Sequence, residues 1–258
     1  MSQDSHLSAP SDSPSAPLAI ILAAGKGTRM LSDLPKVLVP VRGRPMIRYV
    51  IDTLHHAGID RICVVVGYQA DLVRRELADV PGLEFALQEE QLGTGHAVMT
   101  CRKQLAAQSG PVLIVTGDSP VLQVSTVERL LAEFRSQAAS CLMGTVDKED
   151  PTGLGRIVRD AEGNFLAIVE EKDATQEQRE LHEINASTYL FNADDLLQSL
   201  DSLTNTNAQL EYYVTDCPGI LLAAGKSVAA LKVLHPSEAL SINSMDDLKQ
   251  VELAMGQI

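Results

Sequence analysis

Short runs of apolar, mostly β-branched residues alternate along the chain with stretches in which apolar residues recur every three or four positions. The runs lie at 18–22, 61–66, 111–116 and 139–146, and the periodic stretches lie near 44–57, 69–78, 94–107 and 124–137. The runs are typical of buried parallel strands and the stretches of amphipathic helices. Their alternation predicts an α/β fold: a Rossmann-like mixed, mostly parallel sheet with helices on both faces.

The pattern changes after residue 150. Residues 156–159 and 165–169 are typical of two short strands, and the turn residues at 161–164 between them predict a β-hairpin. We expect a small β-rich lid at about 150–190. The remaining elements are predicted as a strand at 184–191, helices near 193–203 and 214–224, a strand at 228–234 and a helix from about 245. Gly225 is expected to end the helix that precedes it.

The chain is predicted to have one domain and a tail. Residues 1–17 are rich in Ser and Pro and have almost nothing apolar to bury, so we expect a disordered tail there. No strong linker divides the rest, which predicts a single domain over 18–258.

Composition narrows the class of partner. The net charge is −13, aromatic residues make up 3% of the chain and Trp is absent, which disfavours nucleic-acid binding. No apolar stretch is long enough to span a membrane, and the N-terminus lacks the charged flank and apolar core of a signal peptide. The four cysteines are far apart and are expected to be reduced, buried thiols. We therefore expect a cytoplasmic protein without a membrane partner.

Candidate chemistry begins where the first strand ends. Its last residues open into the loop Ala23-Ala24-Gly25-Lys26-Gly27, where small side chains let a ligand approach the backbone. The loop lacks the Walker A and G-x-G-x-x-G spacings, and a plain strand-to-helix turn is the alternative interpretation. Arg29 and Lys36 follow within a few residues, and two crowded cations favour an anionic ligand such as phosphate.

A second candidate follows the run at 111–116. Asp118 is placed at the expected carboxyl end of a parallel strand, where open α/β sheets bind ligands. Carboxylate oxygens are natural ligands of Mg²⁺, which is commonly shared between one or two protein groups and substrate phosphates. Asp118 is therefore the predicted magnesium ligand.

Several motifs in order along the chain resemble one family. They are LAAGKGTRMLSDLPKVL at 22–38, Gln88-x-x-Gln91-Leu92-Gly93-Thr94-Gly95-His96-Ala97, Gly117-Asp118-Ser119-Pro120, the segments 150–157 and 169–175, Glu183-Ile184-Asn185 and Glu211-Tyr212-Tyr213-x-Thr215-Asp216. Together they are similar to the sugar-nucleotide pyrophosphorylases, most of all to the uridyltransferase domain of bacterial N-acetylglucosamine-1-phosphate uridyltransferases. The resemblance implies the nucleotide-diphospho-sugar transferase fold, with a sugar-binding lid at about 150–190.

The resemblance also implies roles for single residues. Arg29 and Lys36 would be catalytic and hold the phosphates, and Gln88 would read the uracil edge. Asp118 and Asn243 would hold Mg²⁺, and Gly155, Glu170 and Asn185 would hold the sugar. The implied substrate-binding residues are Leu22, Ala23, Ala24, Gly25, Gln88, Gly93, Thr94, Thr116, Gly117, Gly155, Glu170, Asn185 and Asn243.

Two departures from the family pattern affect the metal site. Ser241-Ile242-Asn243-Ser244-Met245 stands where relatives usually have Gly-Val-Asn-Asn-Arg, and Thr116 stands where many relatives carry Tyr. Judged by residue type alone, Gln88 and Glu170 could equally be polar residues at strand ends. The C-terminal β-helix of the bifunctional relatives is not recognised in this sequence, so acetyltransferase activity is not expected and the oligomeric state stays open.

The resemblance implies that the protein transfers the uridylyl group of UTP to N-acetylglucosamine 1-phosphate and releases pyrophosphate. Two alternatives remain. One is a nucleotidyltransferase of the same fold for another sugar 1-phosphate, such as glucose 1-phosphate. The other is a non-catalytic sensor of sugar nucleotides, which the retained Arg29, Lys36 and Asp118 disfavour. A dinucleotide oxidoreductase does not fit the loop spacing.

Overall fold

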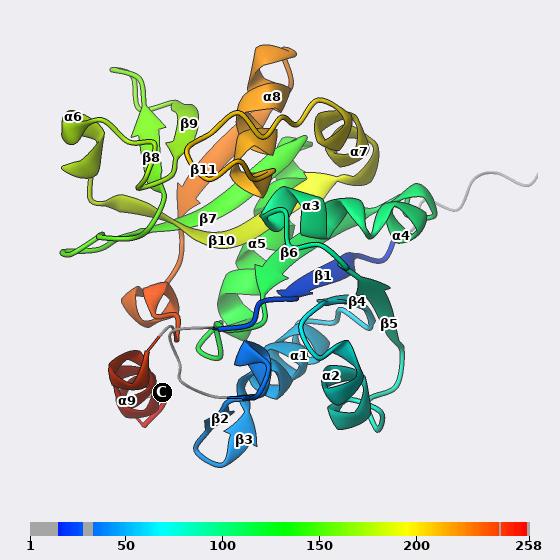
Figure 1. Cartoon of the computed structure of the whole chain (residues 1–258). Helices are drawn as coiled ribbons and strands as arrows, with labels where there is room; N and C mark the ends of the chain where they lie inside the picture. The colour runs from blue at the N-terminus through cyan, green and yellow to red at the C-terminus, as the bar shows by residue number, and fades with distance from the viewer. Residues whose placement is uncertain (1–14, 28–32, 243, 257–258) are drawn as a thin grey trace, which may run out of the picture.

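The computed structural model describes residues 15–27, 33–242 and 244–256. Within them, strands lie side by side in the order β11-β7-β10-β6-β1-β4-β5, and β8 and β9 extend the sheet beside β10 (Figure 1). The strands are β1 Leu18–Ala23, β4 Arg61–Val66, β5 Leu83–Leu87, β6 Pro111–Thr116, β7 Cys141–Asp147, β8 Arg156–Arg159, β9 Phe165–Val169, β10 Glu183–Asn192 and β11 Val228–Lys232. A separate small hairpin joins β2 (Pro40–Val41) to β3 (Arg44–Pro45).

The sheet is mixed, as predicted. The strands β6, β1, β4 and β5 run parallel to one another, whereas β10 is antiparallel to both β6 and β7. The carboxyl ends of β1 and β6 therefore meet at one edge of the sheet. Ligands bind at such an edge in open α/β folds.

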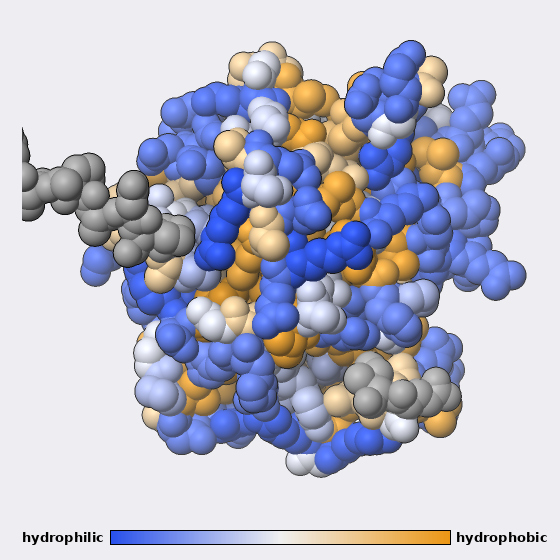
Figure 2. All heavy atoms as spheres, turned by 180° about the vertical axis from the view of Figure 1, so that it is seen from behind, coloured by the Kyte–Doolittle hydropathy of each residue, from blue (hydrophilic) through white to orange (hydrophobic). Residues whose placement is uncertain are grey.

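Helices cover both faces. The described α-helices are α1 Met46–His56, α2 Ala70–Glu76, α3 Thr94–Met99, α4 Arg102–Ala106, α5 Val124–Gln137, α6 Gln176–Arg179, α7 Ala193–Asp201, α8 Cys217–Ala223 and α9 Met245–Ala254. Side chains alternate between the two faces of β1, so Leu18 and Ile20 pack into one core cluster while Ala19 and Ile21 pack into another. The first cluster includes residues of α3, α4, α7 and α8, and the second includes residues of α1, α2 and α5. Polar residues cover much of the back of the molecule, with apolar ones visible between them (Figure 2).

Two predicted elements differ from the structure, and one strand of the structure is not predicted. The helix expected near 94–107 is two short helices, because the chain turns at Thr100 and Cys101 between α3 and α4. The edge strand β5 has no counterpart in the prediction, since Glu84 interrupts the apolar residues of its short sequence LEFAL. The helix expected near 214–224 begins as a 3₁₀ turn at Val214–Asp216 and continues as α8.

The hairpin and the helix end follow the sequence closely. The β-hairpin has the predicted strands 156–159 and 165–169. Gly225 has φ +74° and follows α8, and Lys226 N donates to Leu221 O at 3.0 Å, which is the bond of a Schellman motif. All four cysteines are free and buried.

The region predicted as the lid, about 150–190, holds β8, β9, α6 and the first part of β10, and β8 pairs with the start of β10 (Figure 1). Of the predicted tail, only residues 15–17 are described, and Ala16 O accepts a hydrogen bond from Gln108. Among the helices that the structure describes, none is long and apolar enough to cross a membrane.

Candidate functional site

A cleft of about 310 Å³ opens at the carboxyl ends of β1 and β6. Ten of the residues predicted for substrate, phosphate or metal binding line it: Leu22, Ala23, Ala24, Gly25, Lys36, Gln88, Gly93, Thr94, Thr116 and Asp118. They come from segments nearly 100 residues apart in the sequence, which the parallel strands bring to one edge. Gly117 lies beside the cleft, where its backbone N donates to Leu22 O at 2.9 Å.

The main chain forms much of the cleft wall. Gly93 has φ +102°, and a Cβ at this position would lie 2.5 Å from Tyr212 O. Gly95 N donates to the same Tyr212 oxygen at 2.7 Å, and Tyr212 N donates to Leu92 O at 2.8 Å. The loop at 92–95 is therefore held against the segment around Tyr212 by backbone bonds that only glycine at position 93 permits.

Gln88 is 3% exposed and already has partners within the protein. Its Nε2 donates to Gly93 O at 3.0 Å and lies 3.1 Å from Nδ1 of His96. The Gln88 amide thus fixes the loop that carries Gly93 and Thr94. His96, for which the sequence predicts no role, takes part in this contact.

Gln91 and Glu211, which have no predicted role, also line the cleft. Gln91 Nε2 donates to Ala24 O at 3.3 Å, so it joins the glycine loop to the segment after β5. Both residues belong to motifs that carry the family resemblance, and that membership was the available signal. Their roles depend on contacts between distant segments, which spacing alone does not give.

Lys36 and Asp118 form an ion pair on the floor of the cleft, and their side chains are 15% and 17% exposed. Lys36 is placed by a short 3₁₀ turn, Lys36–Leu38, that buries Val37 and Leu38 in the core. Asp118 follows β6, and the hydroxyls of Thr116 and Ser119 lie 2.9 Å apart next to it in the sequence. Charge and hydroxyl oxygens are thus concentrated at the end of β6.

The Asp118 carboxylate at the end of β6 fits a magnesium ion that is shared with a substrate. No group of three or more His, Cys, Asp or Glu side chains is arranged to hold a metal within the described ranges. Mg²⁺ does not require such a group, because it keeps several waters and takes other oxygens from substrate phosphates. One carboxylate in the cleft, that of Asp118, is therefore an adequate protein ligand.

Three further predicted residues converge in the lid. A Cβ built on Gly155 would lie 3.5 Å from Glu170 Oε1 and 3.6 Å from Asn185 Cβ. Asn185 N donates to Gly155 O at 2.9 Å. Asn185 also lines a cavity of about 120 Å³ together with Thr116 and Asp118, so this cavity adjoins the cleft. Glu170 lines a different cavity, of about 270 Å³.

The electrostatic environment of Glu170 is unusual for a carboxylate. Burial raises its pKa above the ordinary value, Asp216 and Asp173 add to the rise, and a 3.0 Å hydrogen bond from Thr215 opposes it. Asn185 Nδ2 donates to the buried Tyr189 hydroxyl at 2.6 Å, and its Oδ1 accepts from Ser187 N. Both side chains are thus held in place by neighbours and are suited to reading hydroxyl groups. Arg29 and Asn243 lie outside the described residues.

Comparison with known proteins gives a consistent picture. Residues 19–206 match the profile of the MobA-like NTP transferase domain. The bifunctional protein GlmU of Bacillus licheniformis is 41% identical over 239 residues, which is 93% of this chain and 52% of that protein. The GlmU of Pelotomaculum thermopropionicum is 45% identical over 235 residues, 91% of this chain and 51% of that protein. The chain spans about half the length of the curated relatives it matches.

Two solved structures share the fold. A UDP-glucose pyrophosphorylase complexed with UDP-glucose has a TM-score of 0.76 at 17% identity and covers 94% of this chain and 99% of its own. A putative glucose-1-phosphate thymidylyltransferase from Bacillus anthracis has a TM-score of 0.75 at 18% identity, with 94% and 96% covered. These likenesses confirm the predicted α/β fold class.

Proposed function

The chain belongs to the family of MobA-like NTP transferase domains, and from this premise we propose that it transfers the uridylyl group of UTP to N-acetylglucosamine 1-phosphate. The observation that carries the proposal is the meeting of two groups of residues. The cleft that ends at Lys36 and Asp118 adjoins the lid group through the cavity shared by Asp118 and Asn185. This arrangement suits a nucleotide in the cleft and a sugar under the lid, with the phosphates between them.

The reaction needs alignment more than acid–base chemistry. A phosphate oxygen of the sugar phosphate attacks the α-phosphorus of UTP, the bond from that phosphorus to the bridging oxygen breaks, and pyrophosphate leaves with the electron pair. The attacking oxygen is already ionised at neutral pH, so no protein nucleophile is required. The protein's contribution is to hold the two phosphates in line and offset the charge of the leaving group.

We propose that Lys36 and Asp118 perform these tasks. The ion pair between them keeps both side chains oriented before substrates bind. In the complex, we propose that Lys36 turns to the phosphates, with Arg29 as a second cation, and that Asp118, with Asn243, holds the magnesium ion. When bound, Mg²⁺ would offset negative charge on the phosphate oxygens.

Recognition is divided between the two groups. The small residues at 22–25 let the nucleotide lie against the backbone, and Gln88 holds Gly93 and Thr94 around the base and ribose. Glu170, Asn185 and the backbone of Gly155 are placed to bind sugar hydroxyls and the N-acetyl group. A site that hydrogen-bonds a group rejects the analogue that lacks it, because its own polar atoms would be left unpaired.

A pyrophosphate-release assay tests the proposal. The purified protein is incubated with Mg²⁺ and each combination of the common nucleoside triphosphates with several sugar 1-phosphates. We expect the highest kcat/KM with UTP and N-acetylglucosamine 1-phosphate. Preference for glucose 1-phosphate would replace the sugar assignment, and no release with any pair would favour the sensor alternative.

A further inference from the structure

A buried arginine lies directly beside the candidate sugar site. Arg156 follows Gly155 at the start of β8 and is 1% exposed. Its Nη2 donates to Glu171 Oε2 at 2.7 Å and to Arg179 O at 3.3 Å, and its Nη1 donates to Leu154 O. Among the residues that the structure describes, no atom accepts a hydrogen bond from Arg156 Nε.

The guanidinium holds the segments that carry the sugar-reading residues. Leu154 and Arg156 flank Gly155 on either side, and Glu171 immediately follows Glu170. The Arg179 carbonyl belongs to the last turn of α6, and Arg179 Nε returns a bond to Glu171 O at 3.3 Å. One side chain therefore joins the turn that precedes Gly155, the residue that follows Glu170 and helix α6.

Stability alone does not explain a charge at this place. Removing a guanidinium from water is costly, and well-packed apolar residues often replace a buried ion pair without loss of stability. The unpartnered Nε adds to the cost, because a buried donor without an acceptor loses its hydration without replacement. What Arg156 offers, and an apolar side chain does not, is a planar fork of directional hydrogen bonds to the main chain.

We propose that Arg156 and Glu171 are positioning residues that set the spacing between Gly155 and Glu170 for the sugar 1-phosphate. The inference deepens the proposed function and rests on it. Gly155 and Glu170 lie opposite each other where β8 pairs with β9, next to the paired residues Arg156 and Val169. The ion pair between Arg156 and Glu171 crosses the hairpin at this end, so it fixes how far apart the two sugar-reading residues stand.

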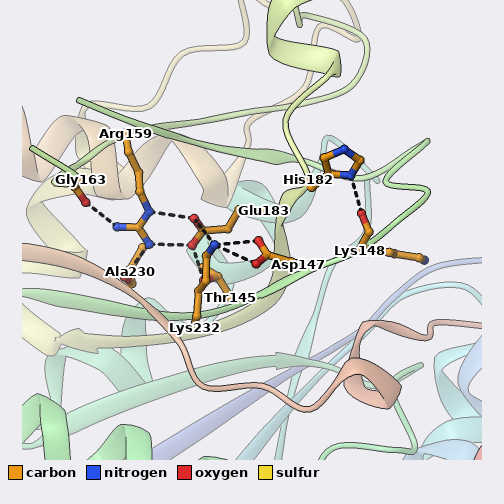
Figure 3. A network of polar contacts seen from close by, with 9 residues as sticks. All are labelled: Thr145, Asp147, Lys148, Arg159, Gly163, His182, Glu183, Ala230 and Lys232. Carbon is orange, nitrogen blue, oxygen red and sulfur yellow. Dashed lines mark hydrogen bonds and ion pairs between the residues drawn. The ribbon is translucent and has the colours of Figure 1, made fainter. Parts of the chain in front are cut away.

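The same hairpin offers a matched control at its other end (Figure 3). Arg159 donates to Glu183 through Nη2 at 2.6 Å and Nε at 2.8 Å, and to Ala230 O at 2.8 Å. Thr145 donates to the same carboxylate at 2.6 Å, and Lys232 lies 3.7 Å from it. This Arg–Glu pair anchors the turn end of the hairpin, where Gly163 O accepts from Arg159 at 2.9 Å, and none of its members has been placed in the site.

Three variants test the positioning pair. Glu171→Gln removes the charge at a partly exposed position with little change in volume, so it preserves the fold. Arg156→Lys keeps the charge and loses the fork, and Arg156→Met with Glu171→Gln removes the pair entirely. Arg159→Lys and Glu183→Gln are the controls. Steady-state KM for each substrate, kcat and the melting temperature are measured for all of them.

We expect the KM for the sugar 1-phosphate to rise about tenfold in the Glu171 and Arg156 variants, since small displacements of positioning groups are costly. The KM for UTP should stay within about twofold, because the UTP cleft lies outside the lid. The controls should lower the melting temperature and leave both KM values near wild type. A parallel rise of both KM values, or a sugar KM no higher than in the controls, would overturn the proposal.

Calorimetric binding of UDP-N-acetylglucosamine separates this inference from the proposed function. A wild-type protein that binds the sugar nucleotide without turning over any substrate pair would refute the transferase function. The positioning role would then still be decided by whether the Glu171 and Arg156 variants bind more weakly than the controls. If the wild type turns over another sugar 1-phosphate, the same KM comparison is made with that sugar.

Discussion

The cleft and the lid use different parts of the chain to form their surfaces. In the cleft, residues 22–25 and the loop at 92–95 present backbone and small side chains, and the walls are joined by main-chain bonds such as that from Gly95 to Tyr212. In the lid, the surfaces are formed by polar side chains that are buried, as Asn185 and Arg156 are, or partly buried, as Glu170 and Glu171 are. The cleft is thus shaped by glycine and other small residues, and the lid by polar side chains that include an ion pair.

The difference follows from the strands. Parallel strands end at one edge of the sheet, so their loops converge there and the backbone itself faces the ligand. The lid is an antiparallel hairpin beside β10, where alternate side chains point to the site and the next ones point away. Charges then accumulate in a small β-rich unit and must be paired, because an isolated buried charge is costly. Substitutions should therefore affect the two halves in different ways.

The largest effect is expected at the junction of cleft and lid, where the proposed function brings both substrates together and one substitution should affect both. Asp118→Asn removes the charge that pairs with Lys36 and that we propose holds the metal. We expect kcat to fall by at least about 10²-fold with little change in melting temperature. Removing one group that stabilises the charge of a transition state lowers kcat by about this factor. Chelation of divalent cations should abolish wild-type turnover, and added Mg²⁺ should restore it. Near-normal turnover of the variant would remove Asp118 from the metal site.

In the cleft, the sharpest test is Gly93→Ala. The added Cβ would meet Tyr212 O at 2.5 Å, and alanine does not favour the φ of +102°. We expect the KM for UTP to rise by about tenfold because the loop is displaced, an effect of the size that misplaced binding groups produce. The KM for the sugar 1-phosphate should change little.

Gly163→Ala is the matched control for that substitution. Gly163 also has a positive φ, +86°, but a Cβ there would meet nothing within 4 Å. This variant should lose about 1 kcal/mol or more of stability through strain alone and keep both KM values. An equal rise of the UTP KM in both variants would show that strain, not the contact with Tyr212, decides the effect.

The same contrast explains what could be predicted from the sequence. Strands and helices with strong periodicity were found, and so were the cleft residues, because each belongs to an ordered motif beside a strand end. The edge strand Leu83–Leu87 was missed, since edge strands need no continuous apolar run. The break at Cys101 was missed because the apolar period continues through it and tertiary packing decides where α3 stops.

The spacing of motifs in the sequence does not predict contacts between distant segments. The bond between Gly95 and Tyr212 joins residues more than 100 positions apart, and nothing local to either residue marks it. Arg156 and Glu171 belong to motifs that the sequence shows, yet only the structure shows that their side chains form an ion pair. The sequence therefore predicted which residues gather at the site, and the structure shows what holds them there.

In the lid, we expect Asn185→Ala to reduce the preference for N-acetylglucosamine 1-phosphate over glucose 1-phosphate by about tenfold, because a lost hydrogen bond to one substrate group costs on that order. The rate with glucose 1-phosphate should fall less, since the other sugar contacts remain. The ratio of the two kcat/KM values measures the effect. Asn192→Ala on the same strand is the control: it removes the N-cap of α7 at a cost of about 1 kcal/mol and should leave the ratio unchanged. Equal use of both sugars by the wild type would refute the N-acetyl assignment.

The smallest expected effect compares two lid carboxylates whose pKa values move in opposite directions. Burial raises the pKa of Glu170, so the folded state favours its neutral form. Its stabilising contribution is present below the unfolded value of about 4.3 and is lost as the pH rises through the folded value.

Glu183 has the opposite sign. Burial alone would raise its pKa, but hydrogen bonds from Arg159 and Thr145 and the charges of Arg159 and Lys232 outweigh burial and lower it. Its contribution is present above about pH 4.3 and is lost as the pH falls through the pKa of the folded state.

At pH 7 we therefore expect Glu170→Gln to melt above wild type and Glu183→Gln below it, each by about 2–4 °C per kcal/mol in a domain of this size. As the pH falls to about 4 and below, where wild-type carboxylates also become neutral, both differences should shrink. Melting curves from pH 3.5 to 8 measure this, and a Glu170→Gln variant less stable than wild type at pH 7 would show that its hydrogen bond from Thr215, rather than burial, dominates.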